Sequence, residues 1–452
     1  MSIHRRHFLV LGAATALTGA AASIARAAPV SALGLDAGQF GLRPGSPDDQ
    51  SRALQRAVDE AARTRAPLAI GPGIYRVGNI RLPSGTNLVG VRGATKFVFT
   101  DGPSLLAAEN ADRVTLSGLS LDGLRRKLPD RRGLVHADQA RGLKIADCEI
   151  VNAGGTAIHL TAVEGQVADT LVADTVVTAI HAFDSRGLLI ARNTIAGAGD
   201  NGIQVWREKQ GDDGTIIADN RIERIENRSG GSGQYGNAIN VFRAGNVIVR
   251  GNRIDNCAFT AVRGNAASNI HIEGNAITNT REVALYSEFG FEGALIANNT
   301  VDGAAIGVSV TNFNEGGRLA AIQGNIIRNL FPKRPAGTDA GDGAGIGIAA
   351  EADTAITGNV IENAPFAGIV LGFGHYLRDV AATGNVVRRA DIGIAVSVST
   401  GAGNALIANN VLSDVVRGAI VGMDRSRIVT GDLMKGGVDR YANLTLSGNR
   451  VR

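Results

Sequence analysis

Residues 246–289 read NVIVRGNRIDNCAFTAVRGNAASNIHIEGNAITNTREVALYSEF and contain the same pattern twice. In each copy, two alternating apolar runs surround a Gly-Asn pair, Gly251-Asn252 or Gly274-Asn275, and a turn then leads to a third short apolar run. The alternation has a period of two, which is typical of strands rather than helices. Each copy therefore predicts three short strands, and a unit this small buries its apolar face only by stacking on its neighbours.

The Asn of this pattern recurs along most of the chain. It stands at Asn193, Asn220, Asn252, Asn275, Asn299, Asn325, Asn359, Asn385, Asn410 and Asn449, with successive gaps of 27, 32, 23, 24, 26, 34, 26, 25 and 39 residues. Repeats in the mid-twenties without hairpin signals fit the coils of a solenoid in which each strand pairs with its equivalent one coil on. The sequence predicts an all-β fold, a single-stranded right-handed parallel β-helix, with the Asn amides stacked at one inward turn where they satisfy buried polar groups.

The composition agrees with a solenoid. The chain has 452 residues with 60 Gly and only 4% aromatic residues, which suits tight repeated turns. A solenoid need not divide into globular domains as it lengthens. We therefore expect one β-helix domain over residues 46–452, with a cap and entry strands at 46–93 and repeated coils at 114–451.

The first 27 residues have the pattern of an export signal, with a basic start, an apolar stretch and Ala25-Arg26-Ala27 as a small-residue cleavage site. The segment around Arg5-Arg6 resembles the twin-arginine signal. We expect the twin-arginine translocation machinery as a partner during export, a linker at 28–45, and a periplasmic or secreted bacterial protein. Ordinary secretion is the alternative, and both routes end outside the cytoplasm.

Two classes of partner are not expected for the mature chain. The apolar stretch of the signal is too short for a stable membrane span, so we expect no integral membrane span. The signal holds three arginines and no acidic residue, and removing these charges from the formal net charge of +4 leaves about +1. A nearly neutral chain gives no indication of a nucleic-acid partner.

A helix is expected just before the first strands. Apolar residues recur at helical spacing from Ala53 to Ala61 and predict an amphipathic helix over 50–63, with Ser46 or Asp48 as its N-terminal cap. Such an N-terminal capping α-helix covers the open apolar end of a solenoid.

The stretch SPDDQSRALQRAVDEA, followed by PLAIGPGIYRVGNIRLPSGTNLVGVRG up to Gly93, resembles the N-terminal entry of the pectate-lyase-like superfamily. Together with the leader and the repeats, it resembles a family of twin-arginine-exported repeat proteins of unknown function, for whose repeat a cofactor has been suggested. The resemblance implies the β-helix fold. It implies no single activity, because the superfamily includes lyases, hydrolases, epimerases and non-enzymes, and the cofactor stays unknown.

The third strand of each coil places one side chain of each coil on the outer face, because alternate residues of a strand point to opposite sides. This outward row reads His159, His181, Gln204, Asn240, Arg263, Tyr286, Ser309, Ala349, Val370, Ala395 and Val421. A parallel row two residues further along reads Thr161, Phe183, Trp206, Phe242, Asn265, Glu288, Thr311 and Glu351. At about 4.8 Å per coil, the seven polar coils make a strip of roughly 30 Å.

Aromatic faces beside hydrogen-bonding side chains are what a sugar chain needs, so the strip predicts a polysaccharide or oligosaccharide ligand. The expected substrate-binding residues are His159, His181, Phe183, Asp200, Gln204, Trp206, Asn240, Phe242 and Asn265. The alternative is that outward residues of any solenoid are polar and that stacked aromatics support the sheet. Long inserts at 207–214, 226–236, 331–343 and 423–441 are expected to wall one face.

The candidate catalytic residues are Arg263, Tyr286 and Glu288. Removing a proton next to a uronate carboxylate requires a base and a cation, and Arg263 and Tyr286 on adjacent coils fit an acid/base pair of the lyase or epimerase type. Glu288 is either a catalytic group or the salt-bridge partner of Arg263. Residues 198–203 resemble the region of adjacent aspartates in polygalacturonases, but Asn201 replaces the second one, which disfavours hydrolysis.

These observations lead to two functional hypotheses. The first is an exported polysaccharide-active protein, a lyase or epimerase of an acidic, uronate-containing glycan. The second is a non-catalytic envelope protein that binds a glycan, a cofactor or another protein. The acidic inserts lack a full spaced set of ligands, so no metal site is predicted. Cys148 and Cys257 lie several coils apart, beyond disulfide reach, and predict two buried free thiols.

Overall fold

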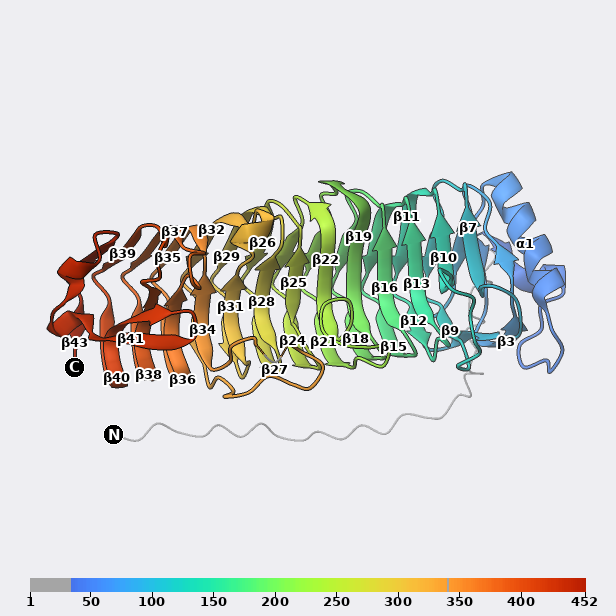
Figure 1. Cartoon of the computed structure of the whole chain (residues 1–452). Helices are drawn as coiled ribbons and strands as arrows, with labels where there is room; N and C mark the ends of the chain where they lie inside the picture. Colours follow the sequence, from blue (N-terminus) through green and yellow to red (C-terminus); the bar gives the residue numbers. More distant parts are fainter. Residues whose placement is uncertain (1–33, 340) are drawn as a thin grey trace, which may run out of the picture.

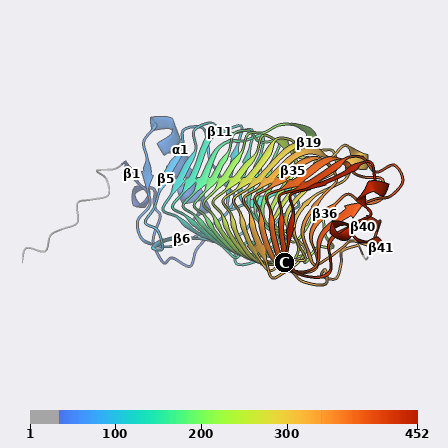
Figure 2. The ribbon, with the colours of Figure 1, turned by 90° about the vertical axis from the view of Figure 1, so that its left-hand side faces the viewer.

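Three columns of parallel strands wind along one axis in the computed structural model, which describes residues 34–339 and 341–452 (Figure 1). Each strand pairs in parallel with its equivalent in the next coil, and the chain completes about 14 turns. The predicted parallel β-helix with one N-terminal helix is confirmed. From the end that Figure 2 brings forward, the coils stack behind one another in register.

Column 1 is a 16-stranded sheet. It consists of β1 (Leu35–Asp36), β2 (Leu68–Ala69), β5 (Asn87–Val89), β8 (Thr115–Ser117), β11 (Arg141–Ala146), β14 (Glu164–Ala168), β17 (Leu189–Ala191), β20 (Ile216–Ala218), β23 (Ile248–Arg250), β26 (Ile270–Glu273), β29 (Glu292–Ala297), β32 (Arg318–Gln323), β35 (Ala352–Thr357), β37 (Arg378–Thr383), β39 (Ala405–Ala408) and β42 (Leu444–Ser447).

Columns 2 and 3, together with the antiparallel strand β41 (Arg427–Asp432), join into a 27-stranded sheet. Column 2 consists of β3 (Gly73–Val77), β6 (Thr95–Phe99), β9 (Ser120–Asp122), β12 (Glu149–Val151), β15 (Leu171–Thr175), β18 (Thr194–Ala198), β21 (Arg221–Ile225), β24 (Arg253–Cys257), β27 (Ala276–Thr280), β30 (Thr300–Asp302), β33 (Ile326–Arg328) and β43 (Arg450–Val451). Column 3 consists of β4 (Ile80–Arg81), β7 (Leu106–Glu109), β10 (Gly133–Asp138), β13 (Thr156–Thr161), β16 (Thr178–Phe183), β19 (Asn201–Asp212), β22 (Asn237–Gly245), β25 (Val262–Asn265), β28 (Val283–Glu288), β31 (Ile306–Val310) and β34 (Ile346–Ala350). Three long strands, β36 (Val360–Leu371), β38 (Val386–Ser397) and β40 (Val411–Asp424), run through both columns.

The Asn ladder forms at the inner corner between columns 1 and 2, as predicted. Each ladder Asn after the first accepts from the backbone N–H and the amide of the preceding ladder Asn. Asn275 Oδ1, for example, lies 2.9 Å from Asn252 N and 3.0 Å from Asn252 Nδ2. Its own amide donates to the carbonyl of Val249 at 3.1 Å. Thr170 extends the ladder toward the N-terminus by donating its N–H to Asn193. These bonds pair polar groups that the tight corner buries.

The N-terminal helix α1 (Ser51–Thr64) covers the first coil, at the blue end of Figure 1. Its buried face consists of Leu54, Ala57, Val58 and Ala61, all without solvent exposure. The predicted side-chain caps are wrong. Gln50 is the cap residue and makes no side-chain cap bond, whereas Ser46 and Asp48 bond to each other and Asp49 accepts from the Ser51 N–H.

The chain enters the solenoid before the helix. The expected export signal at 1–27 and the start of the expected linker lie outside the described residues. Within 34–45, strand β1 pairs with β2, and the short 3-10 helix η2 (Ala37–Phe40) follows. The first strand of column 1 therefore lies earlier than the boundary that we expected at residue 46.

The C-terminal end is covered by its own last insert. Strand β41 (Arg427–Asp432) folds back antiparallel on β40, and two 3-10 helices follow, η4 (Leu433–Lys435) and η5 (Val438–Arg440). Leu433 is buried in the main core, and Val438 and Tyr441 pack against it. This insert thus shields the last coils, where no capping α-helix exists among the described residues.

The inserts border column 3, which matches the expectation that they wall one face. Residues 226–236 and 331–343 lie at the corner between columns 2 and 3, and residues 207–214 and 423–441 lie where column 3 ends. A third loop at the corner between columns 2 and 3, residues 123–132, adds to these walls. The short helix η3 (Phe313–Glu315), which follows β31, does the same where column 3 ends. The inserts therefore wall the outer face of column 3.

Two further expectations concern the buried thiols and the membrane. Cys148 and Cys257 are both free and buried, as predicted. Within the part of the chain that the structure describes, no helix has the length and apolar character needed to cross a bilayer.

Candidate functional site

The strand register aligns the outward row of column 3 as the sequence predicted. His159 pairs with His181, and the line continues through Gln204, Asn240, Arg263, Tyr286, Ser309, Ala349, Val370, Ala395 and Val421. The parallel row from Thr161 to Glu288 is aligned in the same way. Most polar members are nevertheless buried, because inserts and neighbouring side chains cover them.

Three histidines stack at the N-terminal end of the row. His136, which the sequence analysis missed, pairs in register with His159 and extends the line by one coil. The His136 and His159 rings are 5.4 Å apart and stacked, and the His159 and His181 rings are 4.9 Å apart. We call these three residues the histidine ladder.

Burial keeps the histidine ladder neutral. It lowers the pKa of His136 and of His159 to about 4, with a further lowering from the positive charge of Arg132, and it lowers the pKa of His181 to about 3. Nδ1 of His136, Nδ1 of His159 and Nε2 of His181 have no hydrogen-bond partner within the described protein. In residues 34–339 and 341–452, no three His, Cys, Asp or Glu side chains are arranged to hold a metal ion.

Phe183, Trp206 and Phe242 follow on three successive coils and form what we call the aromatic strip. Their backbones are in register, and each side chain is half-buried. The Trp206 ring lies edge-on to Phe242 with centroids 5.8 Å apart, and its indole N–H donates to Asn240 Oδ1 at 3.2 Å. The strip therefore presents fixed aromatic surface to solvent beside buried hydrogen-bonding groups.

A basic loop, residues 123–132, lies beside the histidine ladder. Four of its cations, Arg125, Arg126, Lys127 and Arg131, are exposed and pair with no carboxylate in the described chain. The fifth, Arg132, forms an ion pair with Glu109. Leu128 anchors the loop in the main core, and the positive charge of Arg131 contributes to the lowered pKa of His159. The N-terminal end of the outward row, at the histidine ladder, is thus bordered by uncompensated positive charge.

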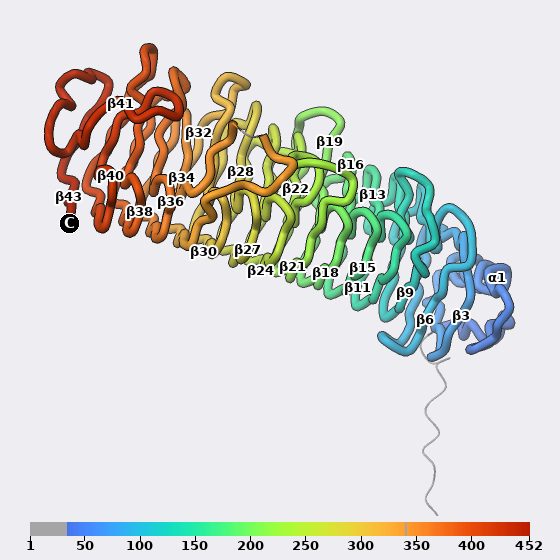
Figure 3. The backbone as a smooth tube through the Cα atoms, turned by 60° about the horizontal axis from the view of Figure 1, so that its bottom comes forward, coloured from blue at the N-terminus to red at the C-terminus, as the bar shows by residue number. Residues whose placement is uncertain are grey.

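Two loops, 226–236 and 331–345, cover the middle of the row, and we call them the roof loops. Figure 3 shows the orange tube of the second loop reaching toward the coil of β22. The loops touch, since the Ser232 N–H donates to the Gly337 carbonyl at 3.2 Å. Asp200 is fully buried and accepts from both the N–H and the hydroxyl of Ser229, so this carboxylate anchors the first roof loop rather than facing solvent.

Beneath the roof loops lies a buried cluster of two arginines and two glutamates, the Arg–Glu cluster: Arg263, Glu282, Glu288 and Arg334. Arg263 bonds Glu288 through Nε–Oε1 at 2.6 Å and Nη2–Oε2 at 2.8 Å. Glu282 accepts from Arg334 at 3.1 Å and from the Ser232 hydroxyl at 2.6 Å. The charges therefore compensate one another within the protein.

Of the three predicted catalytic residues, Arg263 and Glu288 belong to this cluster and bond to each other, and Tyr286 lies beside them. Glu288 also accepts from the Asn265 amide at 2.8 Å. The Arg263 guanidinium lies 4.9 Å above the Tyr286 ring, and burial raises the pKa of the Tyr286 phenol. A neutral phenol cannot act as a base, and a cation already bound to two carboxylates offers little to a substrate carboxylate.

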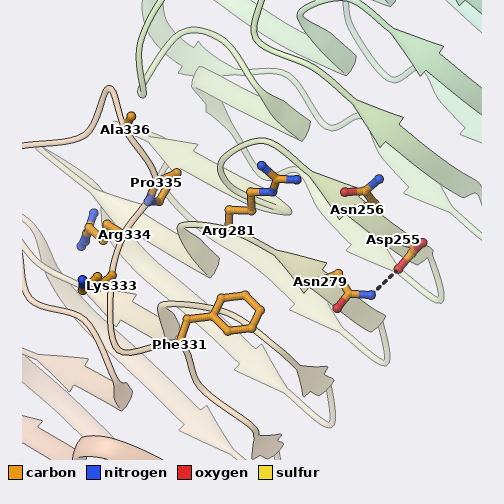
Figure 4. A pocket seen from close by; sticks show the side chains of 9 residues that line it. All are labelled: Asp255, Asn256, Asn279, Arg281, Phe331, Lys333, Arg334, Pro335 and Ala336. Atoms are coloured by element: carbon orange, nitrogen blue, oxygen red, sulfur yellow. Dashed lines mark hydrogen bonds between the residues drawn. The ribbon is translucent and has the colours of Figure 1, made fainter.

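An open groove of about 630 Å³ lies on the outer side of the second roof loop (Figure 4). Arg281 and Lys333 line it, and Asn279 donates to Asp255 at 3.2 Å across its floor. Phe331 faces the same space in the figure. A separate apolar pocket lies on the other side of this loop, over the C-terminal coils of column 3.

Some features of the site left a trace in the sequence and others did not. The segment GLVHA at 133–137 repeats the pattern of TAIHL at 156–160, so His136 could have been found by alignment. The run RRKLPDRR at 125–132 was likewise visible as a charge cluster. Arg334 had no such signal, because its contact with Glu282 is made by the path of a long loop.

Comparisons with known proteins agree with the architecture. A family model described as "Right handed beta helix region" matches residues 158–319 and 210–387, a span that covers just over half of the 452 residues. No curated protein matches the sequence.

Among solved structures, the pre-mature gene product 12 of bacteriophage phi29 aligns with TM-score 0.53 and 12% identity over 92% of this chain and 72% of that one. The catalytic unit of a GH87 alpha-1,3-glucanase from Streptomyces thermodiastaticus gives 0.52 and 15% over 96% and 70%. The surface adhesin PfbA of Streptococcus pneumoniae gives 0.50 and 16% over 87% and 93%. At these identities the likeness concerns the fold alone.

Proposed function

The chain belongs to the right-handed β-helix family, and from this premise we propose that it is an exported protein that binds an acidic polysaccharide along the outer face of column 3. The binding surface runs from the basic loop, past the histidine ladder, to the aromatic strip. As an exported protein it acts in the periplasm or outside the cell.

The observation that carries this proposal is that the uncompensated cations of the basic loop and the aromatic strip lie at the two ends of the histidine ladder, on the same face of the solenoid. Phe183, Trp206 and Phe242 lie one coil apart, and the Arg243 guanidinium covers one face of Phe242 at 4.6 Å from the ring centroid. The aromatic surface that remains exposed can stack on the C–H side of sugar rings. Arg126 and Arg131 supply charge for carboxylate groups of the same chain. Together, these groups favour an acidic glycan over a neutral one.

The geometry favours binding over bond cleavage. Arg263 and Glu288 occupy each other's hydrogen-bonding groups beneath the roof loops, one and two coils beyond Phe242. A lyase or epimerase reaction at Arg263, Tyr286 and Glu288 remains a prediction, and it would need the roof loops to open. A glucanase and an adhesin share the fold, so the fold itself is compatible with either role.

Trp206 provides a direct test, because it is the only tryptophan in the chain and lies in the centre of the aromatic strip. We expect its fluorescence to change, and its quenching by acrylamide to fall, when polygalacturonate or alginate is titrated into the mature protein. Dextran, a neutral glucan, should give a much smaller effect. An identical response to acidic and neutral chains would contradict the preference for an acidic glycan, and no response to any of them would contradict glycan binding on this strip.

A pair of matched variants locates the charge contribution. Arg126→Gln/Arg131→Gln should weaken binding of the acidic chain at least tenfold. The affinity of this variant should also depend less steeply on salt concentration, because fewer ion contacts remain to be screened. Arg250→Gln/Arg253→Gln changes the net charge equally on exposed positions of columns 1 and 2 and should leave binding unchanged. Equal losses in both variants would mean that only the overall charge matters.

The same samples distinguish binding from cleavage. A lyase forms an unsaturated product that absorbs in the ultraviolet, and an epimerase changes the uronate composition that NMR reports. We expect neither change. Product formation that Tyr286→Phe abolishes would establish the enzyme hypothesis instead.

A further inference from the structure

We propose that an apolar pocket over the C-terminal half of column 3 binds a small amphipathic anion, a molecule with an apolar body and one anionic head group. The pocket has a volume of about 430 Å³, within the range of small-molecule sites. Its floor begins at Ala349, five coils beyond Trp206 or about 24 Å at the coil spacing, and it shares no lining residue with the aromatic strip of the glycan site proposed above.

The floor of the pocket is the apolar end of the outward row. Ala349, Val370 and Ala395 point away from the main core and line this space. Phe366 and Val370 connect two small hydrophobic clusters that are separate from the core of the solenoid. An apolar stripe on the outside of a solenoid wall has no role in stacking the coils, so it marks a surface for contact with something else.

Two inserts from different coils wall this floor. The second roof loop contributes Arg334 and Asp342, and the hairpin of β40 and β41 contributes Met423 and Arg425. Figure 1 shows β41 lying across the coils of β38 and β36. Phe373, almost half exposed, stands at the rim. The enclosure gives an apolar ligand contacts on several sides, which a flat patch would not.

The charges around the pocket leave one cation without a partner. Arg334 bonds Asp342 and Glu282, each at 3.1 Å, so its charge is compensated. Glu351 accepts from the backbone N–H of Phe313 at 2.8 Å, and its burial raises its pKa. Arg425 is exposed, and it pairs with no carboxylate among the described residues. An anionic head group at Arg425, with an apolar body on the floor, matches this distribution.

The chemistry of the floor argues against a sugar as the occupant. A saccharide presents hydroxyls on most sides and needs donors and acceptors around it, whereas this floor is built from alanine, valine, isoleucine and phenylalanine side chains. Hydroxyl groups lie at the two ends of the pocket, from Tyr286, Ser309 and Thr311 at one end and from Ser397 and Ser426 at the other, and leave the floor between them apolar. The pocket and the aromatic strip therefore serve different ligand classes.

The first test uses 8-anilinonaphthalene-1-sulfonate, which has an aromatic body and one sulfonate, and decanoate, which has an aliphatic body and one carboxylate. Both should bind the full mature chain with one site per molecule, by fluorescence and by calorimetry. Ala349→Trp fills the floor from an outward position and should weaken both by at least tenfold. Ala355→Trp makes the same change on an exposed position of the next strand, β35 in column 1, and should have no effect.

The second test concerns the head group. Arg425→Gln should weaken decanoate binding at least fivefold while leaving the neutral analogue decanol unchanged. Arg427→Gln, on the same hairpin but outside the pocket, is the control. Absence of saturable binding of either probe to the native protein, or equal binding by the Ala349→Trp variant with unchanged thermal stability, overturns the proposal. Equal losses for decanoate in the two arginine variants would remove Arg425 as the head-group partner.

Discussion

Arg263 on β25 and Glu288 on β28 lie on adjacent coils and form a two-bonded ion pair with exposed fractions of only 7% and 2%. The pair lies outside the main core, yet it is almost as inaccessible to solvent as the core, because the roof loops cover it. A charge buried in this way is costly once its partner is removed. The pair therefore ties the stability of the middle coils to the covering loops.

Arg263→Met should lower the free energy of unfolding by about 3–5 kcal/mol, because Glu288 is left buried without its cation. The double variant Arg263→Met/Glu288→Met should recover most of this loss. Urea unfolding followed by circular dichroism measures both. The control is Arg318→Met, which breaks the exposed ion pair with Glu292 and should cost about 0–1 kcal/mol. If Arg263→Met lowers the free energy of unfolding no more than this control does, the Arg–Glu cluster is accessible to water in solution.

The Asn ladder predicts a position-dependent cost. Asn275→Ala removes the acceptor of two bonds from Asn252 and leaves the Val249 carbonyl without its donor, all in buried surroundings. We expect a loss of about 3 kcal/mol in the free energy of unfolding. Asn449→Ala at the last coil should cost about 1 kcal/mol, because this residue is partly exposed and water replaces the lost bonds. Equal costs at both positions would argue against burial as the cause.

The histidine ladder predicts a loss of stability on acidification. The folded pKa values of His136 and His159, about 4, lie below the unfolded value near 6.5, so the unfolded state binds more protons between these limits. Each histidine should therefore lower the free energy of unfolding by at most about 1.4 kcal/mol per pH unit as the pH falls through that window. His159→Gln should reduce this slope, whereas His271→Gln, which replaces an exposed side chain of β26, should not. Melting temperatures measured between pH 7 and pH 4 give the comparison, and a slope that His159→Gln leaves unchanged would contradict this account.

The two thiols should be inert in the native protein. Burial raises the pKa of Cys148 to about 11 and raises that of Cys257 as well, so neither forms the thiolate that reacts with disulfide reagents. Ellman's reagent should titrate no thiol in the native chain and two in denaturant. A fast-reacting thiol in the native state would show that the coil around it opens. The Cys148→Ala variant would then identify which coil it is.

The features that recur in every coil could be predicted from the sequence. The ladder from Asn193 to Asn449 and the outward row from His159 to Val421 follow from periodicity alone, because every coil faces the same packing constraint. The row also showed where polar side chains give way to apolar ones, at Ala349. The sequence therefore showed the apolar part of the row, although it did not show that this part forms the floor of a pocket.

What does not repeat could not be predicted in the same way. Arg334 reaches Glu282 across 52 residues because the second roof loop folds back over two coils. The same loops explain why the polar residues Gln204, Asn240 and Arg263 are buried although they point outward. The caps of α1 were wrong for a related reason, since Ser46 and Asp48 satisfy each other locally.

The corner between columns 2 and 3 tolerates loops of very different length without disturbing the strand register on either side. At β18 and β19 the turn is two residues, whereas after β33 it is residues 329–345. The Asn ladder occupies another corner and is untouched by such insertions. Loops on this solenoid are therefore separable units: an insertion in one coil can give a new binding wall while the rest of the molecule folds as before. Evolution, or an engineer, can change what such a protein recognises one coil at a time.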